Sequence, residues 1–132
     1  MSQENVELVR RTYEATNQGD YDVAGSYIHP EIEFPTYALS PEAGVYPGKQ
    51  AVREYNENLW EQFESVRFEV EKPLGAGDQV VVVTTQHAVP KGGQREMNVH
   101  VAEVWTIRDG LLAERRSYST RNEALGAAGL QR

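Results

Sequence analysis

The sequence predicts an α+β fold, with helices in the first half of the chain and an antiparallel sheet of at least four strands in the second. Two observations predict it. Apolar residues recur at helical spacing in three segments before residue 65, whereas beyond it they alternate with polar residues at strand spacing. Short turns that contain glycine join the alternating segments, as in hairpins. Helices followed by hairpins are typical of α+β domains.

Three helices are expected before the main sheet. The first begins near the N-terminus and ends at Gly19, the second is short and is stopped by Pro30, and the third spans about residues 49–64. The apolar stripe of the third helix consists of Val52, Tyr55, Leu59 and Phe63. Such stripes pack against a sheet, so the helices are expected to cover one of its faces.

The segment between the second and third helices predicts a short strand and then a loop. Residues 31–34 alternate like a strand, and the prolines within residues 35–48 predict a stiff, irregular loop. Tyr37 and Tyr46 lie in this loop. It is therefore expected to cover the mouth of any cavity beside it.

The second half of the chain predicts four strands and a final helix. Residues 66–71 alternate with one polar face, and the next strand is apolar on both faces from Val80 to Val83. Two further strands follow, over residues 97–107 and from Leu111 onward, and residues 122–130 form a weak last helix. Because both faces of the valine run must be covered, a dimer packed on the outer face of the sheet is expected.

One acidic residue, Glu103, interrupts an otherwise apolar strand face. Alternation places it on the same side as Val101 and Trp105, facing the core. An unpaired carboxylate in an apolar interior is costly, so a partner or a polar-lined cavity must compensate it. Two interpretations stay open: Glu103 lines a pocket as a proton donor, or it forms an ion pair with Arg115 that keeps it ionised.

Composition and net charge limit the kinds of partner that the protein is expected to bind. The 132 residues are enough for a single domain, 1–132, with its own core. A net charge of −7 and the scattering of the basic residues argue against nucleic-acid binding. The lack of cysteine and the spacing of the three histidines argue against a metal site. Without an apolar run of membrane-spanning length or a signal-peptide pattern, no membrane partner and a cytoplasmic location are expected.

Several short segments of the sequence, taken in order, are typical of one family. They are ENVELVRRTYEATNQGD, HPEIEF, GVYPGKQAVREY, GDQVVVV, AEVWTIRDG and NEALGAAGL. Together, from Glu4 to Leu130, they resemble the SnoaL-like, polyketide cyclase-like branch of the NTF2-like superfamily. The resemblance implies a cone in which a curved sheet wraps three helices, with a pocket for a hydrophobic small molecule at its wide end. It also implies a homodimer and chemistry without a cofactor.

The resemblance further implies site residues. Glu103 takes the position of a strand acid that helps to bind the oxyanion in ketosteroid isomerases, so it is the expected catalytic residue, as proton donor or oxyanion stabiliser. Thr36 stands where those isomerases have their general base, and Tyr118-Ser119-Thr120 lacks the acid that cyclases often carry there. The residues expected to line the pocket are Tyr13, Phe34, Thr36, Tyr55, Leu59, Phe63, His87, Val101, Trp105, Arg115 and Ser117.

Two functions from different classes remain open. One is a pocket protein for a hydrophobic ligand, with isomerisation, cyclisation or hydration as the reaction if it is an enzyme. The other is a non-catalytic dimeric binding or assembly module whose cavity is filled by its own side chains. A void of a few hundred cubic ångströms that reaches Glu103 from solvent would distinguish them. His87 is also ambiguous, because alternation places it either at the pocket mouth or on the outer face of the sheet.

Overall fold

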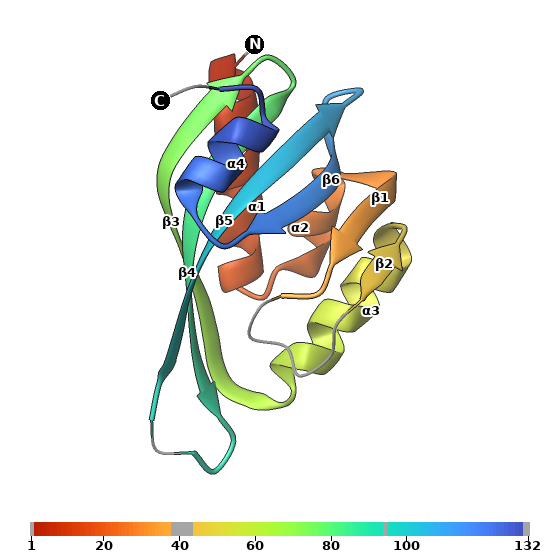
Figure 1. Ribbon diagram of the computed structural model, residues 1–132. Helices are drawn as coiled ribbons and strands as arrows, with labels where there is room; N and C mark the ends of the chain where they lie inside the picture. Colours follow the sequence, from red (N-terminus) through yellow and green to blue (C-terminus); the bar gives the residue numbers. More distant parts are fainter. Residues whose placement is uncertain (1, 38–43, 94, 131–132) are drawn as a thin grey trace.

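The computed structural model describes residues 2–37, 44–93 and 95–130, and Figure 1 shows its elements. In chain order they are α1 (Ser2–Asn17), α2 (Tyr21–Ser26), β1 (Ile28–Pro35), β2 (Val45–Pro47), α3 (Lys49–Trp60), β3 (Phe63–Ala76), β4 (Gln79–Pro90), β5 (Met97–Arg108), β6 (Leu111–Tyr118) and α4 (Arg121–Ala127). The expected loop over residues 35–48 thus lies partly outside the described residues. Its described end forms β2, which alternation does not predict.

The strands form one curved, six-stranded sheet in the order β2-β1-β6-β5-β4-β3. Neighbouring strands are antiparallel except β1 and β6, which run parallel. The antiparallel sheet of at least four strands is therefore confirmed for the consecutive strands β3 to β6, and β1 joins it from the first half of the chain. The β3–β4 hairpin is long and strongly twisted (Figure 1).

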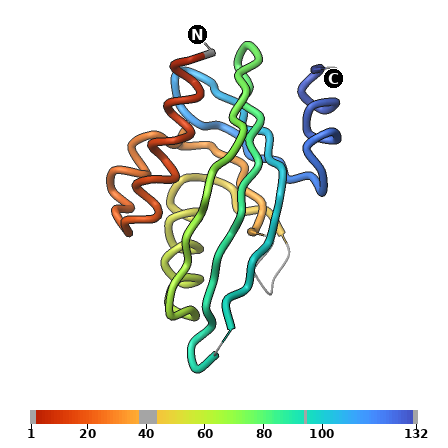
Figure 2. Tube along the Cα trace, turned by 90° about the vertical axis from the view of Figure 1, so that its left-hand side faces the viewer, coloured from red at the N-terminus to blue at the C-terminus, as the bar shows by residue number. Residues whose placement is uncertain are grey.

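Helices cover both faces of the sheet. α1, α2 and α3 lie on one side, and α4, the expected last helix, lies on the other (Figure 2). Thr120 fixes the start of α4 through a capping box with Glu123. The α+β architecture is confirmed: the described part of the chain has three N-terminal helices on one face of the sheet and a fourth helix on the other (Figure 2). None of the described helices has the length and apolar character that crossing a membrane requires.

The valine run of β4 is covered on both faces within one chain. Val80 and Val82 belong to the core under α1 and α3, whereas Val81 lies on the opposite face. There it packs with Ala124 and Leu125 of α4. The inference that a second subunit must cover the outer side of this strand is therefore wrong, because α4 does so.

The boundary between α3 and β3 also differs from the prediction. α3 ends at Trp60, and Phe63 is the first residue of β3 rather than a member of the helical stripe. β3 then continues through Pro73, well beyond residues 66–71. A proline is tolerated there because β3 is an edge strand, where a missing N–H leaves no partner unsatisfied.

Aromatic side chains fill much of the space between the sheet and the three helices on its inner face. Tyr37 is at the middle of this group, with its ring centroid between 4.9 and 5.8 Å from those of four neighbours. These neighbours are Phe34, Tyr55, Trp60 and Phe68. The protein's own side chains therefore occupy a large part of the cone.

Candidate functional site

Glu103 and Arg115 form an ion pair on the helix-covered face of the sheet. In the β5–β6 ladder Glu103 lies opposite Ser117 and Trp105 lies opposite Arg115, so all four residues share one face. The side chains of Glu103 and Arg115 are both 0% exposed. Arg115 Nη1 donates a hydrogen bond to Glu103 Oε2. The ion-pair interpretation of Glu103 is therefore confirmed.

Other groups complete this arrangement, which we call the Glu103 centre: the side chains of Glu103, Arg115 and Tyr13 with the carbonyl of Pro35. Tyr13 Oη donates to Glu103 Oε1, and Arg115 Nη2 donates to the Pro35 carbonyl. Arg115 Cζ also lies 4.3 Å from the centroid of the Phe34 ring. Within this centre, Arg115 Nε is the one buried polar atom without a partner among the described residues. Both oxygens of Glu103 thus accept hydrogen bonds from other side chains.

The ionisation of the neighbouring groups fits this assignment. Burial, followed by the charge of Glu103, raises the pKa of the Tyr13 hydroxyl well above its ordinary value, so Tyr13 remains a neutral donor. Burial opposes the charge of Arg115, but Glu103 and Tyr13 outweigh that effect and the net pKa of the guanidinium is raised. The centre is therefore a carboxylate, a guanidinium and a neutral phenol.

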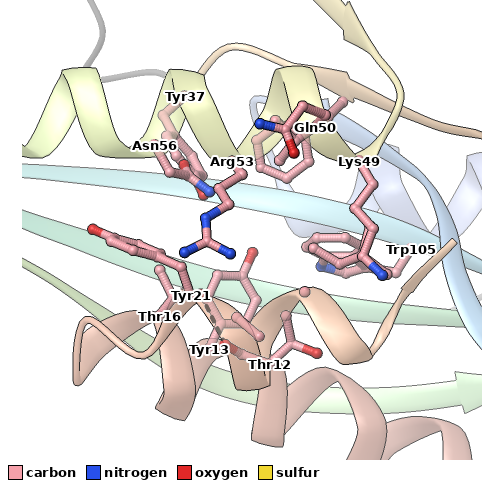
Figure 3. Close-up of a pocket in the computed structure, with 15 residues that line it drawn as sticks. Thr12, Tyr13, Thr16, Tyr21, Tyr37, Lys49, Gln50, Arg53, Asn56 and Trp105 are labelled. Atoms are coloured by element: carbon pink, nitrogen blue, oxygen red, sulfur yellow. Dashed lines mark hydrogen bonds between the residues drawn. The ribbon is translucent and has the colours of Figure 1, made fainter. Parts of the chain in front are cut away.

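A cavity of about 110 Å³ lies beside the Glu103 centre, between α1, α2, α3 and the sheet (Figure 3). Aromatic residues from α1, α2, β1 and β5 form much of its wall, and α2 also contributes the small residues Ala24 and Gly25. The described residues that line it are Thr12, Tyr13, Thr16, Tyr21, Ala24, Gly25, Ile28, Phe34, Tyr37, Lys49, Gln50, Val52, Arg53, Asn56 and Trp105.

Tyr13 separates this cavity from Glu103. Its ring lines the cavity, whereas its hydroxyl binds Glu103, which does not line the cavity. The void is also smaller than the few hundred cubic ångströms expected from the sequence. The Glu103 centre and the cavity are therefore neighbours that share one wall, not a single site.

Two buried polar groups at the cavity have no hydrogen-bond partner in the described part of the chain. They are the indole Nε1 of Trp105 and the amide Oδ1 of Asn56. Trp105 is 2% exposed and Asn56 is 7% exposed. A buried donor or acceptor without a partner is costly, so these two groups are free to bind a ligand or water.

Charged side chains lie at the mouth of the cavity. Arg53 bridges α3 to α2, with Nη1 2.6 Å from Asp22 Oδ1, and it also contacts Glu57 at 3.2 Å on its own helix. Lys49, the first residue of α3, is exposed and has no acidic partner among the described residues. None of the described lining residues is itself an aspartate, glutamate or histidine. The cavity therefore has an unpaired cation at its mouth and no general base in its wall.

The structure brings three of the predicted ligand-binding residues to the cavity: Tyr13, Phe34 and Trp105. Six others are placed elsewhere on the inner side of the molecule or at its rim. Tyr55, Leu59 and Val101 are buried in the core, Arg115 belongs to the Glu103 centre, Phe63 begins β3, and Thr36 lies just after β1. Alternation predicts which residues point to the inner face of the sheet, but side-chain packing decides which of these residues border the cavity.

His87 and Ser117 lie away from the cavity. His87 has the parity of Val81 and therefore projects from the outer face, where its Nε2 is 3.0 Å from Glu69 Oε1 and its Nδ1 is 2.6 Å from Asn98 Oδ1. The pocket-mouth interpretation of His87 is wrong. Ser117 is exposed and borders an open hollow of about 330 Å³ beside β1 and β2.

Apart from Tyr13 of α1, sequence reasoning missed the residues that the helices contribute to the cavity. Asn56 gives the clearest available signal, because it follows Val52 by one helical turn and so places an amide on an apolar stripe. Ala24 and Gly25 carry no such signal, since small residues are common on any helix. Among residues 2–37, 44–93 and 95–130, no group of three or more His, Asp or Glu side chains is arranged to hold a metal ion.

Comparisons with known proteins agree with the fold. A family model described as "SnoaL-like domain" matches residues 9–115. The chain is similar to an NTF2-like protein from Burkholderia thailandensis, with 21% identity, a TM-score of 0.77 and coverage of 96% of this chain and 98% of the other. Among curated protein sequences there is no match.

Two other solved structures share this fold. One has a ketosteroid isomerase-like fold, comes from Catenulispora acidiphila and is in complex with trimethylamine, with 18% identity, a TM-score of 0.75 and coverage of 95% and 94%. The other is an LEH-like epoxide hydrolase from M. tuberculosis, with 14% identity, a TM-score of 0.74 and coverage of 90% and 84%. Identities this low support the shared fold alone.

Proposed function

This chain belongs to the SnoaL-like domain family, and on that premise we propose that it binds a small, mainly apolar molecule in the cavity between α1, α2 and α3. One observation carries the proposal. A cavity walled by buried aromatic rings also contains a donor, Trp105 Nε1, and an acceptor, Asn56 Oδ1, that the described protein leaves unpaired. Ligand sites typically combine an apolar wall with a few such polar anchors.

The cavity volume limits the size of the ligand. An apolar protein cavity of about 150 Å³ holds one benzene molecule. The cavity here measures about 110 Å³ and opens between α2 and α3. The void is smaller than that, but it is open at the mouth, so a single ring can enter with its edge and any substituent at the mouth, whereas a flat polycyclic ligand does not fit inside.

The geometry favours binding over acid/base catalysis. The one buried acid expected to act as a catalyst, Glu103, is held by Arg115 and Tyr13 and lies behind the cavity wall. The described lining contains no carboxylate or imidazole that could move a proton at neutral pH. A catalytic role for Glu103 thus stays a prediction that its contacts do not favour.

The similar structures are consistent with a small ligand. The protein from Catenulispora acidiphila is in complex with trimethylamine, which has only four non-hydrogen atoms. The epoxide hydrolase from M. tuberculosis shows that the same fold also supports catalysis. The fold therefore leaves binding and catalysis open, and the lining residues of this chain favour binding.

A ligand screen with cavity-filling variants tests the proposal. We expect toluene, phenol and cyclohexanone to raise the melting temperature of the protein, because a ligand that binds only the folded state stabilises it. Val52→Phe and Ala24→Leu each place added atoms in the cavity and should abolish this shift. A folded variant of either kind that still responds like the wild type would overturn the proposal.

Two further properties are part of the proposal. We expect a homodimer, as the family resemblance implies, and a cytoplasmic location without nucleic-acid or membrane partners. Val45, 62% exposed on the edge strand β2, leaves an apolar side chain on the surface. Native mass spectrometry at micromolar concentration tests the dimer, and a purely monomeric spectrum would contradict it.

A further inference from the structure

We infer that the ligand carries a carboxylate or an equivalent single anionic group, bound at the mouth of the cavity by Lys49, the N-terminus of α3 and Trp105 Nε1. The inference rests on the proposed binding function and specifies the chemical class of the ligand. Its apolar body would lie against Phe34 and Val52.

Lys49 supplies an uncompensated positive charge. It lines the cavity and has no ion-pair partner in the described part of the chain. Its stem lies over α2, where Lys49 Cε is 3.5 Å from the point at which a Cβ on Gly25 would lie. Figure 3 shows the lysine extending from α3 toward the Trp105 side of the cavity. The ammonium is thus at the mouth rather than directed into bulk solvent away from it.

The N-terminus of α3 adds to this positive potential. Lys49 and Gln50 are the first two residues of the helix, and both line the cavity. The N-cap is Gly48, which has no side chain to accept a hydrogen bond from the first free N–H groups. Unpaired N–H groups and the helix dipole favour an anion at this position.

Trp105 Nε1 is the independent observation that points to a ligand. This donor is buried, lines the cavity through its ring and has no partner among the described residues. An indole N–H can only donate, so its partner must be an acceptor. A carboxylate offers two acceptor oxygens, one for the indole and one for the ammonium of Lys49.

The other charges near the cavity do not cancel this preference. Arg53 is paired with two acids, Asp22 and Glu57, and Gln50 donates a hydrogen bond to a third, Glu54, so none of these side chains adds positive charge to the mouth. The net charge of −7 for the chain repels anions at long range, but salt screens such repulsion beyond about 10 Å at 0.1 M. Direct contacts with Lys49, the free N–H groups of α3 and Trp105 Nε1, rather than the net charge around the mouth, would therefore favour an anion.

Three ligands with the same ring and different head groups test the inference: benzoate, benzyl alcohol and benzylamine. Affinities are measured by calorimetry on the full chain at pH 7. We expect benzoate to bind about tenfold more tightly than benzyl alcohol, since charge-assisted hydrogen bonds are stronger than neutral ones. Benzylamine should bind most weakly. Lys49→Gln should remove the advantage of benzoate without affecting benzyl alcohol, and Lys91→Gln, in an exposed turn, should change neither.

The outcomes separate this inference from the proposed function. Equal binding of benzoate and benzyl alcohol, tighter binding of benzylamine, or an advantage of benzoate that survives Lys49→Gln would each overturn the anion inference while leaving the cavity a ligand site. If none of the three compounds binds, the proposed function itself fails.

Discussion

Two polar regions lie side by side under α1, α2 and α3, and they differ in how far the protein satisfies them. In the Glu103 centre, both carboxylate oxygens and both terminal nitrogens of Arg115 have protein partners, and among the described residues only Arg115 Nε of this centre lacks one. At the cavity, Trp105 Nε1 and Asn56 Oδ1 have none in the described structure. The buried ion pair is thus largely satisfied by the protein, whereas the polar atoms beside the cavity are left unpaired, and we propose that a ligand pairs with them.

The largest effect should come from Glu103→Gln, which removes the charge that compensates buried Arg115. Breaking a buried pair from one side typically costs about 3–5 kcal/mol, so the free energy of unfolding should fall by that amount in urea titrations. Glu64→Gln, at an exposed position, is the control and should change stability by less than about 0.5 kcal/mol. Similar losses for both variants would show that the centre is not a structural ion pair.

A double-mutant cycle sharpens this result. Adding Arg115→Gln to Glu103→Gln should recover part of the loss, with a coupling energy of about 0.5–3 kcal/mol. The reason is that the second substitution removes the charge left unpaired by the first. Strictly additive losses would mean that the two side chains do not depend on one another.

The next effect in size concerns Tyr13, the wall between the two regions. Tyr13→Phe deletes a hydrogen bond to a charged acceptor and should lower the free energy of unfolding by about 1.5–3 kcal/mol, while the ring still lines the cavity. Ring-sized ligands should therefore bind as before. Tyr27→Phe, outside the centre, is the control. Lost ligand binding in a folded Tyr13→Phe variant would argue that the centre takes part in recognition.

A substitution at the cavity should have the opposite effect on stability from those in the Glu103 centre. The amide of Asn56 has an unpaired oxygen, and Asn56→Leu exchanges this amide for an apolar group of similar shape. The free energy of unfolding should therefore stay constant or rise by up to about 1 kcal/mol. Asn58→Leu, an exposed position on the same helix, should bring no gain. A loss of several kcal/mol for Asn56→Leu in thermal denaturation would contradict the view that this amide does not stabilise the fold.

The smallest effect lies on the outer face, away from both regions. The hydrogen bond to Glu69 is the main cause of the raised pKa of His87, and Asn98 adds to it. Stability from this pair is complete below the unfolded histidine pKa of about 6.5 and is lost as pH rises through the raised folded value. The lowered pKa of Glu69 means that it is lost again at acid pH.

Melting temperatures of the wild type and Glu69→Gln measured from pH 5.5 to 8.5 check this prediction. The small advantage of the wild type should shrink as pH rises, because neutral His87 no longer attracts Glu69. Arg67 and Glu96 also act on His87 and are unchanged in both proteins. An advantage that is constant across this range would exclude the linkage.

The sequence predicts the fold better than it predicts the site. Helical and strand spacing identify the elements, and Glu103 is noticeable because it is the one acid on an apolar strand face. The parallel pairing of β1 with β6 and the end of α3 before Phe63 depend on tertiary packing, which periodicity does not contain. The cavity is harder still, since it depends on how the helices pack against the sheet, and two of its lining residues, Ala24 and Gly25, carry no sequence signal.

The indole N–H of Trp105 provides the most direct test of the central claim that the cavity, not the Glu103 centre, receives the ligand. The chain has two tryptophans, so a ¹H–¹⁵N spectrum contains two indole signals, and Trp60, which does not line the cavity, is the internal control. During a benzoate titration the Trp105 indole signal should move downfield to saturation while that of Trp60 stays in place. A saturable benzoate response that leaves the Trp105 indole unchanged would contradict the account.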